Sequence, residues 1–236
     1  MDIKSFDINS NGILLKGTVY IPAVDIKGIV LIVHGMAEHR KRYNDFCTYL
    51  SNNNYVSYVY DQRGHGETSP SIDLLGYMDD FDNLKAMIED VKNVCITLKN
   101  KFPNKPIILL GHSMGSFISQ RYHQLYPETI DALILSGTNY TKNSLYTLGR
   151  FLAKTIVLFK GRKYKSKFLD KMSFGSYNKH VKNPKTQFDW LSLNEENVNA
   201  YIKDEYCGNL FTCSYFYDLL NMFKDINKGF RKKIID

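Results

Sequence analysis

The sequence has no apolar segment long enough to cross a lipid bilayer. Its continuous apolar runs are short, as in Ile29 to Val33, whereas a membrane-spanning helix needs about 20 such residues. Met1 to Ser10 mixes charged and apolar side chains and contains no apolar core of the kind found in a secretory signal peptide. These absences favour a cytoplasmic protein.

Cysteine is also scarce. The four cysteines, Cys47, Cys95, Cys207 and Cys213, form no C-x-x-C pair and no metal-ligand spacing, so we expect reduced thiols. No G-K-[ST] motif follows a glycine turn, which excludes a P-loop nucleotide site. The sequence therefore predicts neither a metal nor a cofactor.

Positive charge is concentrated in one segment. Arg150 to Lys171 contains eight basic residues and one acid, Asp170, and so accounts for the formal net charge of +7. The basic residues are Arg150, Lys154, Lys160, Arg162, Lys163, Lys165, Lys167 and Lys171. Such a patch suits nucleic acid or anionic lipid, and a solvated face is the simplest alternative. Of the two partners we expect transient contact with a membrane surface and no nucleic acid.

The chain has 236 residues, 44% of them hydrophobic, which is enough for one domain with a sizeable core and an inserted subdomain. Short apolar runs alternate with helical patterns over residues 1–139. The predicted strands are Gly12 to Ile21, Gly28 to Val33, Tyr55 to Tyr60, Ile107 to Leu110 and Ala132 to Leu135, and the predicted helices include Asp45 to Leu50, Asp79 to Lys101 and Phe117 to Tyr126. This alternation predicts an α/β fold with a doubly wound, mostly parallel sheet.

The pattern changes after Asn139. Residues 140–213 give no clear strand signal, and the apolar positions between Leu148 and Phe159 lie near helical spacing. We therefore predict a helical cap inserted between a core of residues 1–139 and a returning helix at residues 214–236.

The most informative segment is Gly111-His112-Ser113-Met114-Gly115, which stands between an apolar run and an amphipathic stretch. G-x-S-x-G in a strand–turn–helix context is typical of the nucleophile elbow. Such a turn forces the serine into a strained, left-handed backbone conformation, and the flanking glycines avoid collision with the adjacent strand and helix. We expect the Ser113 hydroxyl to stand exposed above the sheet, beside helix N-terminal N–H groups.

Two further motifs stand at the ends of earlier predicted strands. They are His34-Gly35-Met36-Ala37-Glu38-His39 with Arg42-Tyr43, and Asp61-Gln62-Arg63-Gly64-His65-Gly66-Glu67-Thr68. With the elbow, their order resembles the monoacylglycerol lipase and lysophospholipase branch of the α/β-hydrolases, also called the serine aminopeptidase group. The similarity is specific from Gly12 to about Leu135. It is looser through the cap, where Asp204 to Leu210 is similar to the segment that leads back to the core.

The resemblance implies that Ser113 is the nucleophile and that the backbone N–H groups of Met36 and Met114 form the oxyanion hole. It also implies that Asp61 and His65 belong to a structural turn shaped by Arg63 and Gly64, with a catalytic dyad as the lesser alternative. We expect a structural role for His112, and we expect Glu38 and His39 to fix the oxyanion loop.

The chain departs from the family pattern in one respect. The fold's triad runs in the order Ser, Asp or Glu, then His, and only His123 and His180 follow Ser113. His123 is expected on the wrong side of the elbow and His180 in the cap. Since the resemblance places the acid and the histidine beyond the returning helix, we expect a fragment that lacks the C-terminal strands and is weak or inactive alone.

The function that the resemblance implies is hydrolysis of carboxylic esters of lipids, monoacylglycerol or lysophospholipid, through an acyl-enzyme on Ser113. An aminopeptidase or amidase on the same fold and a catalytically inactive binding protein remain alternatives. If later strands are missing, Ala132 to Leu135 is left as an apolar sheet edge with unpaired backbone groups. We expect this edge to be covered by a second copy of the chain or by C-terminal residues from elsewhere.

Overall fold

One six-stranded sheet organises the computed structural model, which describes residues 1–78, 83–139 and 143–233. The strands are β1 (Asp2–Ser5), β2 (Ile8–Ser10), β3 (Ile13–Leu15), β4 (Gly17–Ile21), β5 (Gly28–Val33), β6 (Tyr55–Tyr60), β7 (Ile107–His112) and β8 (Ala132–Ser136). The helices are α1 (Asn44–Asn52), α2 (Asn83–Lys101), α3 (Met114–Leu125), α4 (Asn143–Lys160), α5 (Lys167–Phe174), α6 (Glu195–Lys203) and α7 (Cys213–Lys233). Short 3₁₀ helices are η1 (Arg40–Tyr43), η2 (Gly66–Thr68), η3 (Ile72–Leu74), η4 (Pro127–Thr129), η5 (Tyr177–His180) and η6 (Asp189–Leu191).

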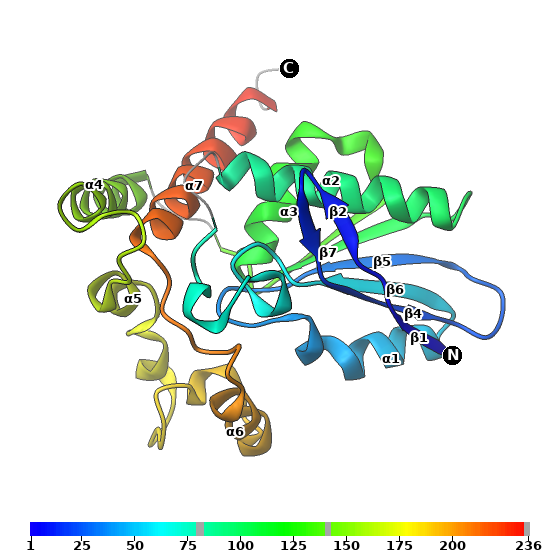
Figure 1. Cartoon of the computed structure of the whole chain (residues 1–236), viewed down its shortest axis with the longest axis horizontal. Coiled ribbons are helices and arrows are strands. Elements are labelled where there is room, and N and C mark those ends of the chain that lie inside the picture. The colour runs from blue at the N-terminus through cyan, green and yellow to red at the C-terminus, as the bar shows by residue number, and fades with distance from the viewer. Residues whose placement is uncertain (79–82, 140–142, 234–236) are drawn as a thin grey trace.

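The sheet is mixed, with the strand order β1-β4-β6-β5-β7-β8. β5 pairs in parallel with both β6 and β7, and β7 pairs in parallel with β8, whereas β4 is antiparallel to both β1 and β6. Figure 1 shows α1 below the sheet and α2 and α3 above it. The α/β class with a mostly parallel, doubly wound sheet is confirmed. The short strands β1 and β2 lie in a segment for which no strand was predicted, and the predicted strand from Gly12 to Ile21 is two strands.

β5 explains why the core needs helices on both faces. All six of its residues are buried. Val30 and Ile32 pack in a cluster with Cys47 of α1, while Leu31 and Val33 pack in the larger cluster that contains α2 and α3 residues. Each such side chain contributes about 1.5–3 kcal/mol when it is fully buried. The central strand is therefore fixed, and its carboxyl end holds the next loop in place.

The edge strand β8 differs from β5. It pairs with β7 alone, and Ile134 is 47% exposed. No other described segment pairs with the outer edge of β8, so the described part of the chain does not itself supply the expected cover. A second copy at this edge remains a prediction.

Helices α4, α5 and α6 lie to one side of the sheet, and α7 runs from them toward the core (Figure 1). α4 packs along α7, and α7 packs on α2 and α3. An isolated antiparallel bridge joins Lys165, between α4 and α5, to Thr212, directly before α7. The predicted division at residues 139 and 213 remains a prediction. The first predicted turn of α2, residues 79–82, and residues 140–142 lie outside the described residues.

None of the helices in the described ranges combines the length and the apolar character that a membrane span requires.

Candidate active site

The turn between β7 and α3 places Ser113 in a strained conformation. Its φ is 50° and its ψ is −118°, a combination that residues with a Cβ seldom adopt. The Ser113 N–H donates to the carbonyl of Ser136, 2.9 Å away, and Ser116 donates its Oγ–H and its N–H to the Ser113 carbonyl at 2.6 and 2.9 Å. The backbone expected of a nucleophile elbow is therefore present.

The two glycines of the motif are required by space. A Cβ on Gly115 would overlap the carbonyl oxygen of Val33 in β5, and a Cβ on Gly111 would lie 2.5 Å from the Ser119 hydroxyl and overlap the Gly115 carbonyl oxygen. Real Cβ atoms do not approach other heavy atoms this closely. The predicted collision with the adjacent strand and helix is confirmed at both positions.

Gly35, after the end of β5, lies beside the elbow. A Cβ at this position would be 3.2 Å from the Cβ of Ser113. The next residue, Met36, is half-buried, and Met114 is buried as the first residue of α3. The first N–H groups of a helix have no partner within it and carry partial positive charge. Backbone N–H groups at this place can stabilise an oxygen that becomes negative near Ser113.

Glu38 holds the start of the loop that carries Met36, which we call the oxyanion loop (residues 34–39). Its buried carboxylate accepts hydrogen bonds from the N–H of Gly35 at 2.5 Å, from Tyr43 at 2.9 Å and from Arg42 at 2.6 Å. Burial raises the pKa of the Tyr43 hydroxyl well above its ordinary value, so the hydroxyl remains a donor at neutral pH. Glu38 thus lies in a structural network, as the sequence analysis expected.

Asp61 and His65 form no catalytic dyad with each other. Asp61 accepts from Arg40 and from the N–H of Glu67, while Nδ1 of His65 donates to the carbonyl of Arg63 at 3.0 Å. Burial lowers the pKa of the His65 imidazole well below its ordinary value, so the ring is neutral. The structural interpretation of this turn agrees with these contacts.

Arg63 fastens the same turn to the core. Its guanidinium donates to the buried carboxylate of Asp90 at 2.6 and 2.8 Å and to the carbonyl of Ser10 at 3.0 Å. Gly64 has a φ of 71°, and a Cβ there would lie 2.7 Å from the Tyr77 carbonyl oxygen. His112 faces β8 instead, with Nδ1 3.1 Å from the Ser136 hydroxyl.

A cap segment that the sequence analysis did not assign to the site contacts the oxyanion loop. Ala37 has a φ of 59°, and its carbonyl accepts from the Tyr201 hydroxyl at 2.8 Å and from the N–H of Gly208 at 3.0 Å. Nε2 of His39 lies 2.7 Å from a carboxylate oxygen of Asp204. No local signal could have revealed these contacts, because about 165 residues separate the partners.

Asp204 also lies close to a cysteine. The imidazole of His39, the carboxylate of Asp204 and the thiol of Cys207 place their polar atoms within 4.8 Å of one another. Burial alone would raise the pKa of the Asp204 carboxyl, but hydrogen bonds from His39 and from the Tyr206 N–H outweigh it and lower the pKa. Asp204 is therefore ionised at neutral pH and accepts from its neighbours.

No histidine in the described ranges hydrogen bonds to the Ser113 hydroxyl. His123 lies on α3 ten residues after Ser113, about 15 Å along the helix axis. His180 is exposed at the end of η5. The described residues thus provide a nucleophile position and candidate N–H donors, without a general base in contact.

Known proteins that are similar to this chain in sequence include lipases. A monoacylglycerol lipase of Mycolicibacterium smegmatis is 32% identical over 126 residues, which are 53% of this chain and 43% of that protein. A monoglyceride lipase homolog of monkeypox virus is 29% identical over 149 residues, which are 63% of this chain and 51% of the viral protein. The chain thus spans about half the length of these relatives.

Solved structures match nearly the whole chain. A thermostable carboxyl esterase from Bacillus coagulans superposes with a TM-score of 0.84 at 24% identity, covering 96% of this chain and 74% of the esterase. A soluble variant of the monoglyceride lipase from Saccharomyces cerevisiae gives a TM-score of 0.70 at 21% identity, covering 95% and 70%. At these identities the likeness shows the α/β-hydrolase fold alone.

The family match extends through the predicted core and the predicted cap alike. Residues 24–234 match the family described as serine aminopeptidase, S33. This range contains the elbow, the oxyanion loop, the cap helices and α7. The chain therefore belongs to the serine aminopeptidase S33 family of α/β-hydrolases.

Proposed function

We propose that the protein containing this chain is a serine hydrolase that cleaves carboxylic esters of lipids, monoacylglycerol or lysophospholipid. The observation that carries the proposal is the strained Ser113 between two glycines that tolerate no side chain. The monoacylglycerol lipase of Mycolicibacterium smegmatis and the viral monoglyceride lipase homolog support the substrate class. Since the chain spans about half of those relatives, the proposal concerns the whole protein.

In the proposed reaction the Ser113 oxygen attacks the ester carbonyl and gives up its proton to a general base. The carbonyl oxygen becomes negative in the tetrahedral intermediate, and the N–H groups of Met36 and Met114 stabilise it. Loss of one such donor typically lowers the rate by about 10²–10³-fold. The intermediate expels the alcohol, which takes up the proton, and water then releases the fatty acid from Ser113. Neither the general base nor the acid that would pair with it is identified among the residues that the structure describes.

A fluorophosphonate probe tests the nucleophile directly. The full protein should become labelled at Ser113, Ser113→Ala should abolish labelling, and Ser173→Ala on α5 should leave it unchanged. Labelling at another serine, or none in a protein that is shown to be folded, would overturn the proposal.

The family's name, serine aminopeptidase, leaves peptide cleavage as an alternative activity. Turnover of a monoacylglycerol should therefore be measured beside turnover of an aminoacyl anilide by the same preparation. A preference for the anilide would favour the aminopeptidase alternative, and binding without turnover of either would favour a binding protein.

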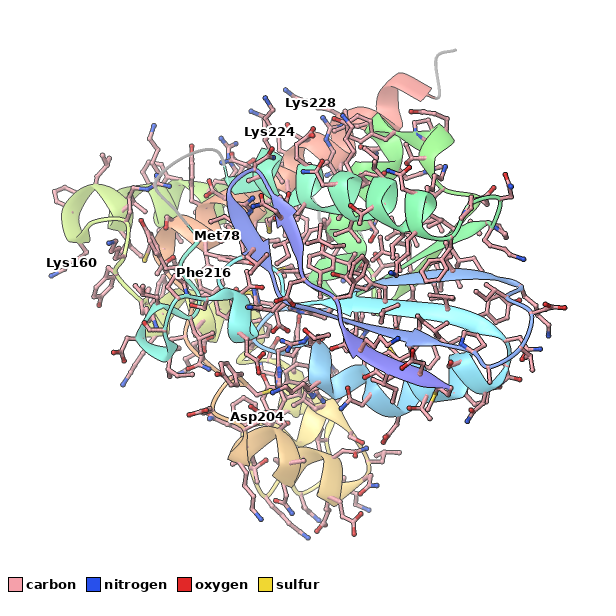
Figure 2. All side chains as sticks on the ribbon, turned by 45° about the vertical axis from the view of Figure 1, so that its right-hand side comes forward. Met78, Lys160, Asp204, Phe216, Lys224 and Lys228 are labelled. Carbon is pink, nitrogen blue, oxygen red and sulfur yellow. The ribbon has the colours of Figure 1, made fainter. Side chains whose placement is uncertain are left out.

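We also propose that α4 and α5 contact a membrane surface. The apolar side chains Leu148, Phe151, Leu158 and Phe159 follow one side of α4 and are 55%, 67%, 74% and 82% exposed. Lys154 and Lys160 on the same helix are exposed as well, and Figure 2 shows Lys160 at the outer end of α4, pointing away from the core. An exposed apolar side with a basic border is complementary to anionic lipid.

The structure selects which charges to reverse in a test of that surface. Lys165 donates to the carbonyl of Asp73 and Lys163 lies over the Tyr77 ring, so neither is a free surface charge. Reversal of Lys160, Lys167 and Lys171 to Glu should weaken binding to anionic vesicles and its salt dependence, while reversal of Lys27, Lys99 and Lys105 should not. Equal binding by both variants would show that the basic residues only form a solvated face.

A second copy at the β8 edge is a separate proposal, which a measurement of the protein's mass in solution would test.

A further inference from the structure

The oxyanion loop contains a strained residue that the cap secures. Ala37 is one of six residues other than glycine in the described ranges with a positive φ, at 59°, and it is 8% exposed. A residue with a Cβ holds this conformation only when its surroundings impose it. The Glu38 network fixes the N–H of Gly35, whereas the carbonyl of Ala37 accepts from Tyr201 and Gly208 instead. That carbonyl points to the cap.

Three contacts from one cap segment, Tyr201 to Gly208, reach the loop. The Tyr201 hydroxyl and the Gly208 N–H converge on the Ala37 carbonyl, and Asp204 accepts from His39 two residues later. His39 is buried, and Figure 2 places Asp204 where the α6 region faces the core. The segment therefore holds both ends of the short stretch that follows Met36.

The cap segment is itself rigid enough to serve as an anchor. Tyr201 is 5% exposed, its ring packs edge-on against Phe188 with centroids 5.0 Å apart, and the Arg42 guanidinium lies over it at 4.9 Å. Gly208 has a φ of 67°, and a Cβ there would approach Phe188 to 3.0 Å. The Tyr201 ring is thus held between Phe188 and Arg42 at the position from which its hydroxyl reaches the Ala37 carbonyl.

We propose that Tyr201 and Asp204 are positioning residues that hold Ala37 in its left-handed conformation and thereby aim the N–H of Met36 at the substrate oxygen. Both act through the loop and touch no reacting atom. This inference rests on the proposed role of Met36 in the oxyanion hole. It makes the cap, beyond any contact with substrate, a part of the machinery that stabilises the transition state.

The test compares Tyr201→Phe, Asp204→Ala and the matched control Tyr177→Phe, which removes a hydroxyl from a cap tyrosine packed on Trp190. Two quantities are measured in the full protein: the labelling rate of Ser113 by a fluorophosphonate and the amide hydrogen exchange of residues 34–39. We expect Tyr201→Phe to slow labelling and speed exchange about fivefold, the value of one ordinary hydrogen bond. Asp204→Ala should change both by about tenfold, and Tyr177→Phe neither.

A rescue separates positioning from general destabilisation. Ala37→Gly removes the steric reason for the loop to relax, so in the Tyr201→Phe background it should restore most of the labelling rate and protection. Unchanged exchange in Tyr201→Phe and Asp204→Ala would overturn the inference, and so would a loss of labelling that follows the melting temperature and resists rescue. If the wild type is folded but unlabelled, the proposed function fails, whereas the exchange measurement still decides whether the cap holds the loop.

Discussion

Ser113 and Ala37 both have a positive φ beside the same candidate site, but different parts of the chain hold them there. The elbow at Ser113 is fixed from close by, where Gly115 packs on β5 and Ser116 bonds to the Ser113 carbonyl. The oxyanion loop at Ala37 is fixed by Tyr201 and Gly208 from the far end of the cap. Strain at one site is therefore supported in two ways, by the core for the nucleophile and by the cap for the loop.

The core support should be the more costly to disturb. Gly115→Ala puts a methyl group against the Val33 carbonyl in the buried strand β5, and backbone here cannot give way easily, so we expect a loss of about 3 kcal/mol in the free energy of unfolding. Gly12→Ala is the matched control, since its φ is 84° with no atom within 4 Å of the new methyl, and it should cost about 1 kcal/mol. Urea unfolding measures both. Equal losses would show that space at the elbow does not matter.

Removing the strain at the nucleophile should stabilise the protein. Ser113→Gly relieves a backbone strain of about 1–3 kcal/mol and adds a glycine cost of about 0.5–1 kcal/mol, for a net gain of about 1 kcal/mol. Ser113→Ala keeps the Cβ and should gain little. The comparison of the two urea midpoints isolates the backbone, and a Ser113→Gly midpoint no higher than that of Ser113→Ala would contradict the strain.

The smallest effect concerns the ion pairs that Arg40 and Lys41, directly after the oxyanion loop, form with Glu67, and their contribution to stability at acid pH. Hydrogen bonds from Arg40 and Lys41 lower the pKa of Glu67 to about 2. Because the folded pKa lies below the ordinary value of about 4.3, the ion pair stabilises the fold above that pH, and this contribution is lost as the pH falls toward 2. Glu67→Gln should therefore flatten the dependence of unfolding free energy on pH between about 4.5 and 2. A parallel pH curve for the variant would show that the pair contributes nothing.

The features that the sequence could predict are those that nearby residues determine, and the features that it could not predict depend on distant residues. β5 and β6 begin and end where their apolar runs do, because each is buried on both faces. The elbow could be recognised because Gly111, Gly115 and Ser116, which shape the turn, stand within a few positions of Ser113. The contacts of this turn with Val33 and Ser136 are distant in the sequence. Local chemistry and local structure coincide at these places.

Other features depend on partners that are distant in the sequence. β1 is exposed along its whole length, so it carries no alternation of apolar and polar residues, and its strand conformation comes from pairing with β4. The conformation of Ala37 and the pairing of His39 with Asp204 arise only after the cap has folded onto the core. Glu38 and His39 could be predicted to fix a loop, but not which cap residues complete the network.

The cap-to-loop contacts also change where the protein divides into exchangeable parts. A chimera that replaces the whole segment predicted to be inserted, residues 140–213, would remove Tyr201, Asp204 and Gly208 together with α4 and α5. A junction near Asn194, the N-cap of α6, would instead leave the anchoring segment with its loop and free the earlier helices for substitution. The unit that can be transplanted between relatives is thus shorter than the predicted insertion, and its boundary lies inside the predicted cap.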